Sequence, residues 1–351
     1  MAEVRPAILE LTLVRLREFL REPEALFWTF GFPLLLAAGL GIAFRSRPPE
    51  TVRVGVLASA PAVARAALDS VAGIAAVPLA DDSAAAHALR TGQVALVVAP
   101  AGATGTAAGV EYRFDPSRPE ARMARLVADE AIQRGAGRTD PMGVREATVQ
   151  ERGSRYIDFF IPGLLGLNLM GSGIWSIAFA VVTARNRKLL KRLVATPMSR
   201  AQYLASFLVS RLIFLVLELA ALVGFGVFVF DVPLRGSLGA LLVVSLLAAL
   251  TFSALGLLVS SRARTVEAVS GIANFVMLPM WIFSGVFFSA ANFPAALQPF
   301  IQALPLTATV DSLRAIMLQG KPLASLGGEL ALIAGWLVVP FVVALRIFRW
   351  R

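Results

Sequence analysis

The chain has 351 residues, of which 57% are hydrophobic and 16% are charged, and its formal net charge is +10. A soluble domain carries about 25% charged residues, so this composition is typical of a membrane protein. The basic residues lie mostly in short loops and beside apolar runs, where membrane topology explains them better than nucleic-acid binding does. The absence of cysteine excludes disulfides, thiolate metal sites and cysteine nucleophiles.

Residues 1–24 predict an amphipathic helix that lies in the membrane interface on the cytoplasmic side. The alternative is a surface helix of a soluble domain, but an apolar run follows within a few residues. Four leucines recur on one helical face and three charged residues lie largely opposite them: Leu9, Leu13, Leu16 and Leu20, then Glu10, Arg17 and Arg21.

The first predicted transmembrane helix covers residues 25–44. Residues 26–44 form 19 uncharged positions, about enough to cross the hydrocarbon. Pro33 lies within this run, which a membrane helix tolerates with a kink and neighbouring partners. The basic residues before the run place the N-terminus in the cytoplasm.

Residues 45–157 are more polar and predict a small α/β domain, because strand-like and helix-like runs alternate there. The domain is expected outside the cytoplasm, because the first span leads away from a cytoplasmic N-terminus. The predicted strands cover 51–57, 93–99 and 110–114, and the predicted helices cover 62–71, 83–90 and 120–134.

This α/β region offers no convincing catalytic or metal site. His87 is the chain's one histidine and falls on a predicted surface helix. Asp81 and Asp82 precede that helix, where aspartate more often caps a helix than binds metal. We therefore assign neither catalytic residues nor a metal site.

The remaining region, residues 158–351, predicts transmembrane helices 2–6. Alternation from a cytoplasmic N-terminus puts the loop at 185–200 and the C-terminus inside, and these segments are basic, as the positive-inside rule expects. The apolar runs cover 159–184, 212–230, 238–261, 268–310 and 330–345.

The run over 268–310 has 43 uncharged residues and is too long for one span. We expect a span to about residue 289 and then short helices near 294–303 and 307–319, which together form an external re-entrant segment over 290–320. Such a segment is allowed where protein or a water-filled cavity covers it. The alternative is a plain extracellular loop.

Three polar side chains within the spans are candidates for a translocation pathway: Glu218, Asn168 and Asn274. A carboxylate inside the membrane costs about 2.5–3.5 kcal/mol on insertion scales unless it is paired or hydrated. Glu218 therefore lines a polar pathway, or pairs with Arg211, or is protonated in a helix contact. Asparagines in membranes often only bond to neighbouring helices. A small-residue face on the second span indicates close helix packing; it consists of Gly163, Gly166, Gly171 and Gly173.

The loop at 185–200 contains six basic residues and no acidic one. Its leucines recur at helical spacing, which favours an amphipathic helix along the membrane surface. Thr196-Pro197 ends one helix and begins the next, because proline cannot continue a helix but fits a first turn. The chain has no G-x-x-x-x-G-K-[ST] phosphate loop, so its energy must come from an ion gradient or a partner.

Short runs of sequence follow one another in an order and at spacings that together point to one family. They are Leu16-Arg-Glu-Phe-Leu-Arg-Glu-Pro-Glu-Ala-Leu-Phe-Trp28 with Phe32-Pro33, Lys188-Leu-Leu-Lys-Arg-Leu-Val-Ala-Thr-Pro-Met-Ser199, Leu255-Gly-Leu-Leu-Val-Ser260, Phe283-Ser-Gly-Val-Phe-Phe288, Leu304-Pro-Leu-Thr307 and Asp311-Ser-Leu-Arg314.

In these runs the chain resembles the permease subunits of ABC-2 type ABC exporters, in the version with an extracytoplasmic domain between the first two spans. The resemblance implies a polytopic α-helical protein of the bacterial inner membrane with both termini in the cytoplasm. It also implies a partner ATPase subunit that binds ATP and Mg²⁺, a second permease subunit in a homodimer or heterodimer, and a periplasmic adaptor. No cofactor is expected in this chain itself.

The same resemblance assigns the loop at 185–200 as the coupling helix that sits in a groove of the ATPase. Many family members have acidic residues and a Gly-Thr pair early in this loop, whereas this chain has Asn186 and Lys188, so individual salt bridges are not assigned. The implied interface residues are Arg185, Arg187, Lys188, Leu190, Arg192, Thr196 and Pro197.

Two other functions stay open at this point. An ion-driven secondary transporter would show paired repeats and several ionisable groups within the membrane, and only Glu218 is clear. A membrane sensor or assembly protein would use the outer domain to bind a ligand. A neighbouring gene for a P-loop ATPase favours the exporter over both.

Overall fold

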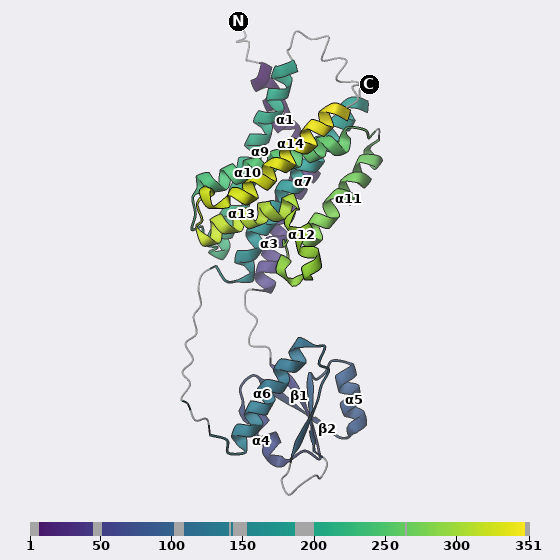
Figure 1. The fold of residues 1–351 in the computed structure, drawn as a ribbon, viewed down its shortest axis with the longest axis vertical. Helices are drawn as coiled ribbons and strands as arrows, with labels where there is room; N and C mark the ends of the chain where they lie inside the picture. Colours follow the sequence, from purple (N-terminus) through teal and green to yellow (C-terminus); the bar gives the residue numbers. More distant parts are fainter. Residues whose placement is uncertain are drawn as a thin grey trace. The chain divides into compact units, whose positions relative to one another are not determined.

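A computed structural model describes residues 7–44, 51–101, 109–139, 142, 153–186, 200–263 and 265–347. The chain divides into two compact units (Figure 1). The membrane unit comprises Met1–Arg45 and Gln150–Arg351, and the α/β unit comprises Ser46–Val149. Each unit has a hydrophobic core of its own.

The described part of the membrane unit contains 6 helices that are long and apolar enough to cross a membrane, which confirms the six predicted spans. Both α1 (Ala7–Arg21) and the C-terminal end of α14 lie at the same end of this unit (Figure 1). After a composite first span, the other spans are α7 (Tyr156–Asn186), α9 (Arg200–Phe230), α10 (Leu238–Ser260), α11 (Val266–Phe283) and α14 (Gly327–Ile347).

The first span consists of α2 (Pro23–Leu26), a π-helical turn over Phe27–Gly31 and α3 (Phe32–Ala43). The amide of Phe32 donates to the carbonyl of Phe27, five residues back, as a π turn requires. Pro33 then falls in the first turn of α3, where its missing amide is tolerated. The chain thus accommodates the proline with a widened turn just before it.

Helix α1 confirms that the N-terminal segment is helical, and it packs along α9; its place in the membrane interface stays a prediction. The ring of Phe19 lies 4.5 Å from that of Phe214 on α9 and 6.2 Å from that of Phe30. Glu10 and Arg17 are exposed. Phe19 thus joins α1 to α9, while Leu9 and Leu20 of the predicted apolar face are 46% and 64% exposed.

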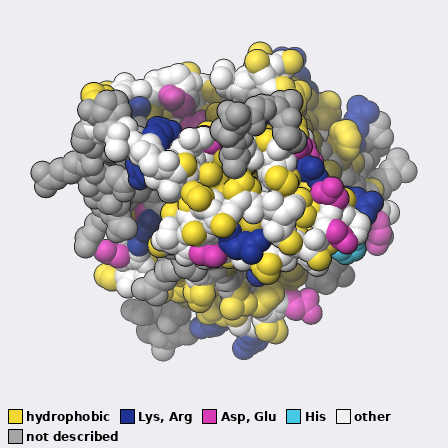
Figure 2. Space-filling model, turned by 90° about the horizontal axis from the view of Figure 1, so that it is seen from below, with side chains coloured by type: hydrophobic (Ala, Val, Ile, Leu, Met, Phe, Trp, Pro, Cys, Tyr) yellow, Lys and Arg dark blue, Asp and Glu magenta, His cyan; other side chains and the backbone are white. Residues whose placement is uncertain are grey.

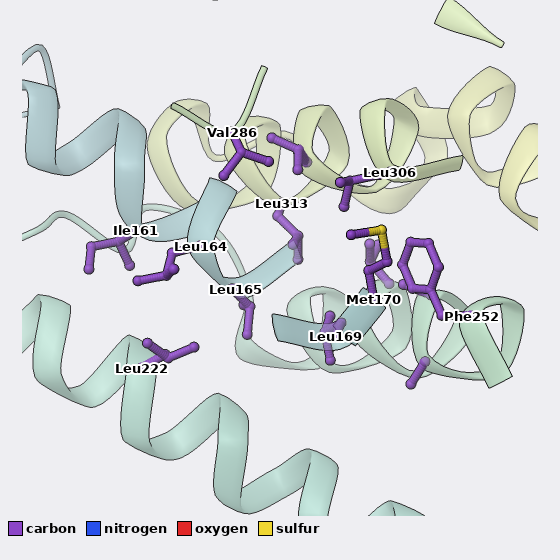
Figure 3. Close-up of a cluster of buried hydrophobic side chains, with 14 of the residues drawn as sticks. Ile161, Leu164, Leu165, Leu169, Met170, Leu222, Phe252, Val286, Leu306 and Leu313 are labelled. Carbon is purple, nitrogen blue, oxygen red and sulfur yellow. The ribbon is translucent and has the colours of Figure 1, made fainter. Parts of the chain in front are cut away.

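Helix α7 forms the centre of the membrane core (Figure 3). Its large side chains point toward α9, α10 and α13 (Pro305–Gln319). The labelled side chains in that view are Ile161, Leu164, Leu165, Leu169, Met170, Leu222, Phe252, Val286, Leu306 and Leu313.

Glycines allow neighbouring segments to approach α7 closely. A Cβ on Gly163 would lie 2.8 Å from the carbonyl oxygen of Val286, and one on Gly173 would lie 2.7 Å from the Cβ of Phe252. From the opposite side, a Cβ on Gly256 would lie 2.6 Å from the carbonyl oxygen of Ile174. Close packing is confirmed at these positions. A Cβ on Gly171 would meet no atom within 4 Å outside its own helix, so the prediction of close packing is wrong there.

The segment after α11 forms short helices, as predicted, and not a plain loop. They are η2 (Ala290–Asn292), η3 (Ala295–Leu297), α12 (Gln298–Gln302) and α13. Most of α13 is buried. Arg314 of α13 donates to the carbonyls of Phe159, at 3.2 Å, and Gly285, and its guanidinium lies 3.5 Å from the ring centroid of Phe159. Through Arg314, helix α13 is therefore bonded to α7 and to the turn after α11.

The α/β unit contains a four-stranded sheet in the order β2-β1-β3-β4, in which only β4 is antiparallel. Helices α4 and α6 cover the core on one side, while α5 packs into a separate cluster. The strands are Val52–Leu57, Ile74–Leu79, Leu96–Pro100 and Val110–Arg113, and the helices are α4 (Ala62–Ser70), α5 (Asp82–Arg90) and α6 (Pro119–Gly135).

The sequence reasoning missed β2. Its residues, Ile74–Leu79, include Ala75, Ala76 and Pro78, which are poor strand formers, so no strand signal stood out. Proline is tolerated because β2 is an edge strand and pairs only with β1. On the face in Figure 2, described side chains of Lys and Arg and of Asp and Glu are scattered among apolar ones.

Candidate functional site

A buried polar cluster joins α7 to α9 inside the membrane unit. Glu218 of α9 is only 1% exposed. Its Oε1 accepts a hydrogen bond from Nη1 of Arg211 at 3.2 Å, and its Oε2 accepts one from the hydroxyl of Ser172 at 3.1 Å. Nη2 of Arg211 also donates to that hydroxyl at 2.9 Å. The three side chains, which we call the Glu218 triad, therefore close a ring of hydrogen bonds.

Of the alternatives predicted for Glu218, the structure shows the pairing with Arg211. The two residues are separated by two helical turns, so both lie on the same face of α9 and both reach Ser172 on α7. Removing two charges from water is costly, and close pairing with additional hydrogen bonds offsets that cost. A role for Glu218 in a pathway stays a prediction.

The two asparagines lie in different surroundings. Asn168 is buried one turn before Ser172 on α7, and within the described residues its Nδ2 has no hydrogen-bond partner. Asn274 is exposed on α11, where Phe275 and Leu278 are exposed too. Within the described part of the chain, no hydrogen bond joins either asparagine to Glu218, so the structure does not gather the three candidates into one site.

Asn274 is not the only polar side chain on the outer surface of the spans. Ser176 of α7 is also exposed, although its hydroxyl donates to the carbonyl of Ser172 in its own helix. Polar groups facing lipid are unfavourable, so such a surface is expected to face water or another subunit.

Arg185, the first residue of the predicted coupling loop, lies at the end of α7 and contacts the end of α10. Its Nη1 donates to the carbonyls of Ala263 at 2.6 Å and Ser260 at 3.3 Å, and its Nη2 donates to that of Ser261 at 3.4 Å. The guanidinium of Arg185 is charged, because an arginine side chain is not deprotonated in proteins.

The other predicted coupling residues lie outside the described residues. The structure nevertheless fixes both ends of their segment, because α7 ends at Asn186 and α9 begins at Arg200. The predicted residues in between are Arg187, Lys188, Leu190, Arg192, Thr196 and Pro197.

Sequence reasoning missed a second buried ion pair, at the start of α7. The carboxylate of Asp158 is fully buried and receives two hydrogen bonds from the guanidinium of Arg155, at 3.0 and 2.8 Å, and one from its backbone amide at 3.0 Å. Arg155 also donates to the carbonyl of Asp231 at the end of α9. The available signal was the three-residue spacing of opposite charges just before a predicted span.

The polar groups of the α/β unit serve its fold. Asp81 caps α5, as predicted: its carboxylate accepts from the amide of Ala84 at 2.8 Å. His87 is exposed on the same helix. No group of three or more His, Cys, Asp or Glu side chains that could hold a metal ion occurs in the parts of the chain that the structure describes.

Comparison with known proteins gives one family over most of the chain. Residues 23–346 match the model of the ABC-2 family transporter protein. Nodulation protein J of Rhizobium leguminosarum bv. viciae is 31% identical over 102 residues, which are 29% of this chain and 39% of that protein. The probable multidrug ABC transporter permease YbhS of Escherichia coli K12 is 28% identical over 166 residues, or 46% of this chain and 44% of that protein.

A longer match is to the inner membrane transport permease YadH of Escherichia coli K12. It is 24% identical over 204 residues, which are 56% of this chain and 75% of that protein. The chain thus spans less than half the length of Nodulation protein J and of YbhS, and most of the length of YadH.

Proposed function

Because the chain belongs to the ABC-2 family of transporter proteins, we propose that it is the membrane subunit of an exporter that a separate ATPase drives. The observation that carries the proposal is the family match, which extends from the first span to the last. The chain lacks a phosphate loop, so ATP and Mg²⁺ would bind to the partner and not to this chain.

The ATPase would dock on the basic loop at 185–200. Its first residue, Arg185, lies at the same end of the membrane unit as the turn from α10 to α11. A strongly basic loop between spans is expected on the cytoplasmic side, where an ATPase has access to ATP. The multi-pass chain would then have both termini in the cytoplasm of a bacterium, in its inner membrane, with the α/β unit on the other side.

A second permease subunit would complete the pathway. The exposed polar side chains of Ser176 and Asn274 support this, because a second copy or a water-filled path would shield them from lipid. The cargo would be a molecule with both apolar and polar parts, such as a drug, a lipid or a glycoconjugate. The word "multidrug" in the name of YbhS supports the first of these classes. The α/β unit would be available to a periplasmic adaptor.

Charge reversal in the loop tests the docking. The double variant Arg187→Glu/Lys188→Glu should strongly reduce co-purification of a co-expressed P-loop ATPase, because a basic loop favours an acidic rim on its partner. The matched control is Arg235→Glu/Lys321→Glu, which changes the same charge at two exposed positions outside this loop. Equal yields of the complex for the wild type and the loop variant would contradict the proposal.

A further inference from the structure

We infer that Arg185 is a positioning residue, which clamps the base of the coupling loop to the turn between α10 and α11 and does not itself contact the ATPase. The inference rests on the proposed function in one respect, namely that the loop at 185–200 binds an ATPase. Its structural part stands on the contacts of this chain alone.

The guanidinium of Arg185 occupies the C-terminal end of α10. The last carbonyls of a helix have no partner within the helix, and this end carries a partial negative charge. Arg185 donates to the last carbonyl of α10, that of Ser260, and to those of Ser261 and Ala263 in the turn that follows. Its planar, multi-donor head suits several acceptors at once, so a guanidinium engaged in this way is directed toward α10.

The turn between α10 and α11 also packs against α7 through apolar side chains. Ala263 is buried and packs in a small cluster with Ala178 and Val182 of α7 and Val269 of α11. Its carbonyl accepts the shortest of the three hydrogen bonds from Arg185, at 2.6 Å. The end of α7, the turn and the start of α11 are therefore joined by both packing and hydrogen bonds.

The helix that follows the loop, α9, is also tied to α7 by an arginine. Arg211 of α9 joins the Glu218 triad and thereby ties α9 to Ser172 of α7. Both ends of the loop thus connect to α7, and at Arg185 the connection continues by hydrogen bonds to the end of α10 and the turn after it. A displacement of the loop base would therefore act on the α10–α11 turn through the Arg185 hydrogen bonds as well as through the packing of α7.

The first test uses the purified full chain without any partner. Because the chain has no cysteine, spin labels can be placed at Asn186→Cys and Arg262→Cys, both exposed. Electron paramagnetic resonance should give a narrow distance distribution with Arg185 present. Arg185→Gln should broaden it and shift it to longer distances, and Arg185→Lys should lie in between, because lysine keeps the charge but not the fork of donors. The control Arg346→Gln removes an exposed arginine from the end of α14 and should change nothing.

The second test uses the complex with a co-expressed ATPase. Arg185→Gln should leave ATPase capture at the wild-type level, unlike Arg187→Glu/Lys188→Glu. In the wild type the distance between the labels should be the same with and without nucleotide, and in Arg185→Gln it should change when nucleotide binds. A purely structural role would not produce that nucleotide dependence.

Two results would overturn the inference. One is an unchanged, narrow distance distribution in Arg185→Gln. The other is a loss of ATPase capture in Arg185→Gln as large as that of the loop charge reversal, which would make Arg185 a direct contact. If the wild type captures no ATPase, the proposed function fails and the coupling role fails with it, while the distances still decide whether the clamp exists.

Discussion

Substitutions in the Glu218 triad should reveal a strongly coupled pair. We consider Arg211→Met, Glu218→Met and the double variant, because methionine replaces each side chain with an apolar one of comparable length. Arg211→Met leaves a carboxylate that is 1% exposed without its cation. Glu218→Met leaves a guanidinium that is 13% exposed without its carboxylate.

The structure sets the expected magnitudes. Removing one partner of a buried, hydrogen-bonded ion pair typically costs about 3–5 kcal/mol, because the remaining charge is buried alone. Replacing both partners by apolar residues is often neutral or stabilising by about 1–4 kcal/mol. We therefore expect each single variant to be much less stable than the double variant. The Ser172 hydroxyl, which bonds to both charged groups, should moderate the single losses.

A double-mutant cycle measures this coupling. The free energy of unfolding of the four proteins would be determined by titrating sodium dodecyl sulfate into mixed micelles, with helicity as the readout. The coupling energy should exceed the roughly 0.3–0.5 kcal/mol within which distant sites add. Single losses below about 1 kcal/mol that add in the double variant would refute the account of Glu218 as half of a buried pair.

The same residue allows the pathway hypothesis to be separated from the structural one. Glu218→Gln keeps the shape of the side chain and its acceptor oxygen while removing the charge. Transport at the wild-type rate by Glu218→Gln would eliminate a role for the carboxylate in the pathway. A loss of transport by a variant with normal stability would support that role.

Four further predictions address packing and backbone geometry. Gly256→Ala should cost about 1–3 kcal/mol in the same assay, because its Cβ would lie 2.6 Å from a backbone carbonyl oxygen, whereas Gly171→Ala, with open space around it, should be neutral or stabilising by up to about 1 kcal/mol. Asp231 has a φ of 55°, so Asp231→Val should lose more stability in thermal unfolding than Asp231→Gly, and an equal loss in both variants would argue against backbone strain. Arg314→Met should lower stability by about 2–3 kcal/mol and increase proteolysis of the segment before α13, and unchanged protection would contradict the fastening role. Hydrogen bonds from the amide of Ala84 and the hydroxyl of Ser83 lower the pKa of Asp81, so its stabilisation of α5 should be fully present above about pH 4 and lost as the pH falls through the lowered pKa; hydrogen exchange of α5 that is equally pH-dependent in Asp81→Ala would contradict this.

Sequence patterns predicted the elements that depend on local information. Long uncharged runs located the six spans, and the positions of the prolines located the short helices α12 and α13. Asp81 was predicted as a cap because capping uses a residue three positions away. In each case the information lies in one continuous stretch of the chain.

Several features that were not predicted depend on residues far apart in the sequence. Glu218 pairs with Arg211 within its helix, but Ser172, 46 positions away, completes the ring. Arg185 and the carbonyl of Ala263 are 78 positions apart, and Arg314 and that of Phe159 are 155 apart. Helix packing creates these contacts, and no local periodicity marks them.

The central claim is that a separate ATPase drives this membrane subunit through the loop at 185–200, and a cross-linking experiment tests it most directly. A photoreactive maleimide would be attached to Arg192→Cys in the otherwise cysteine-free chain, in membranes that also contain the co-expressed ATPase. The account predicts a cross-link to the ATPase, of reduced yield when Arg187→Glu/Lys188→Glu is added. If the label reacts fully at residue 192, the ATPase is present in the membrane, and no cross-link forms, the claim is contradicted.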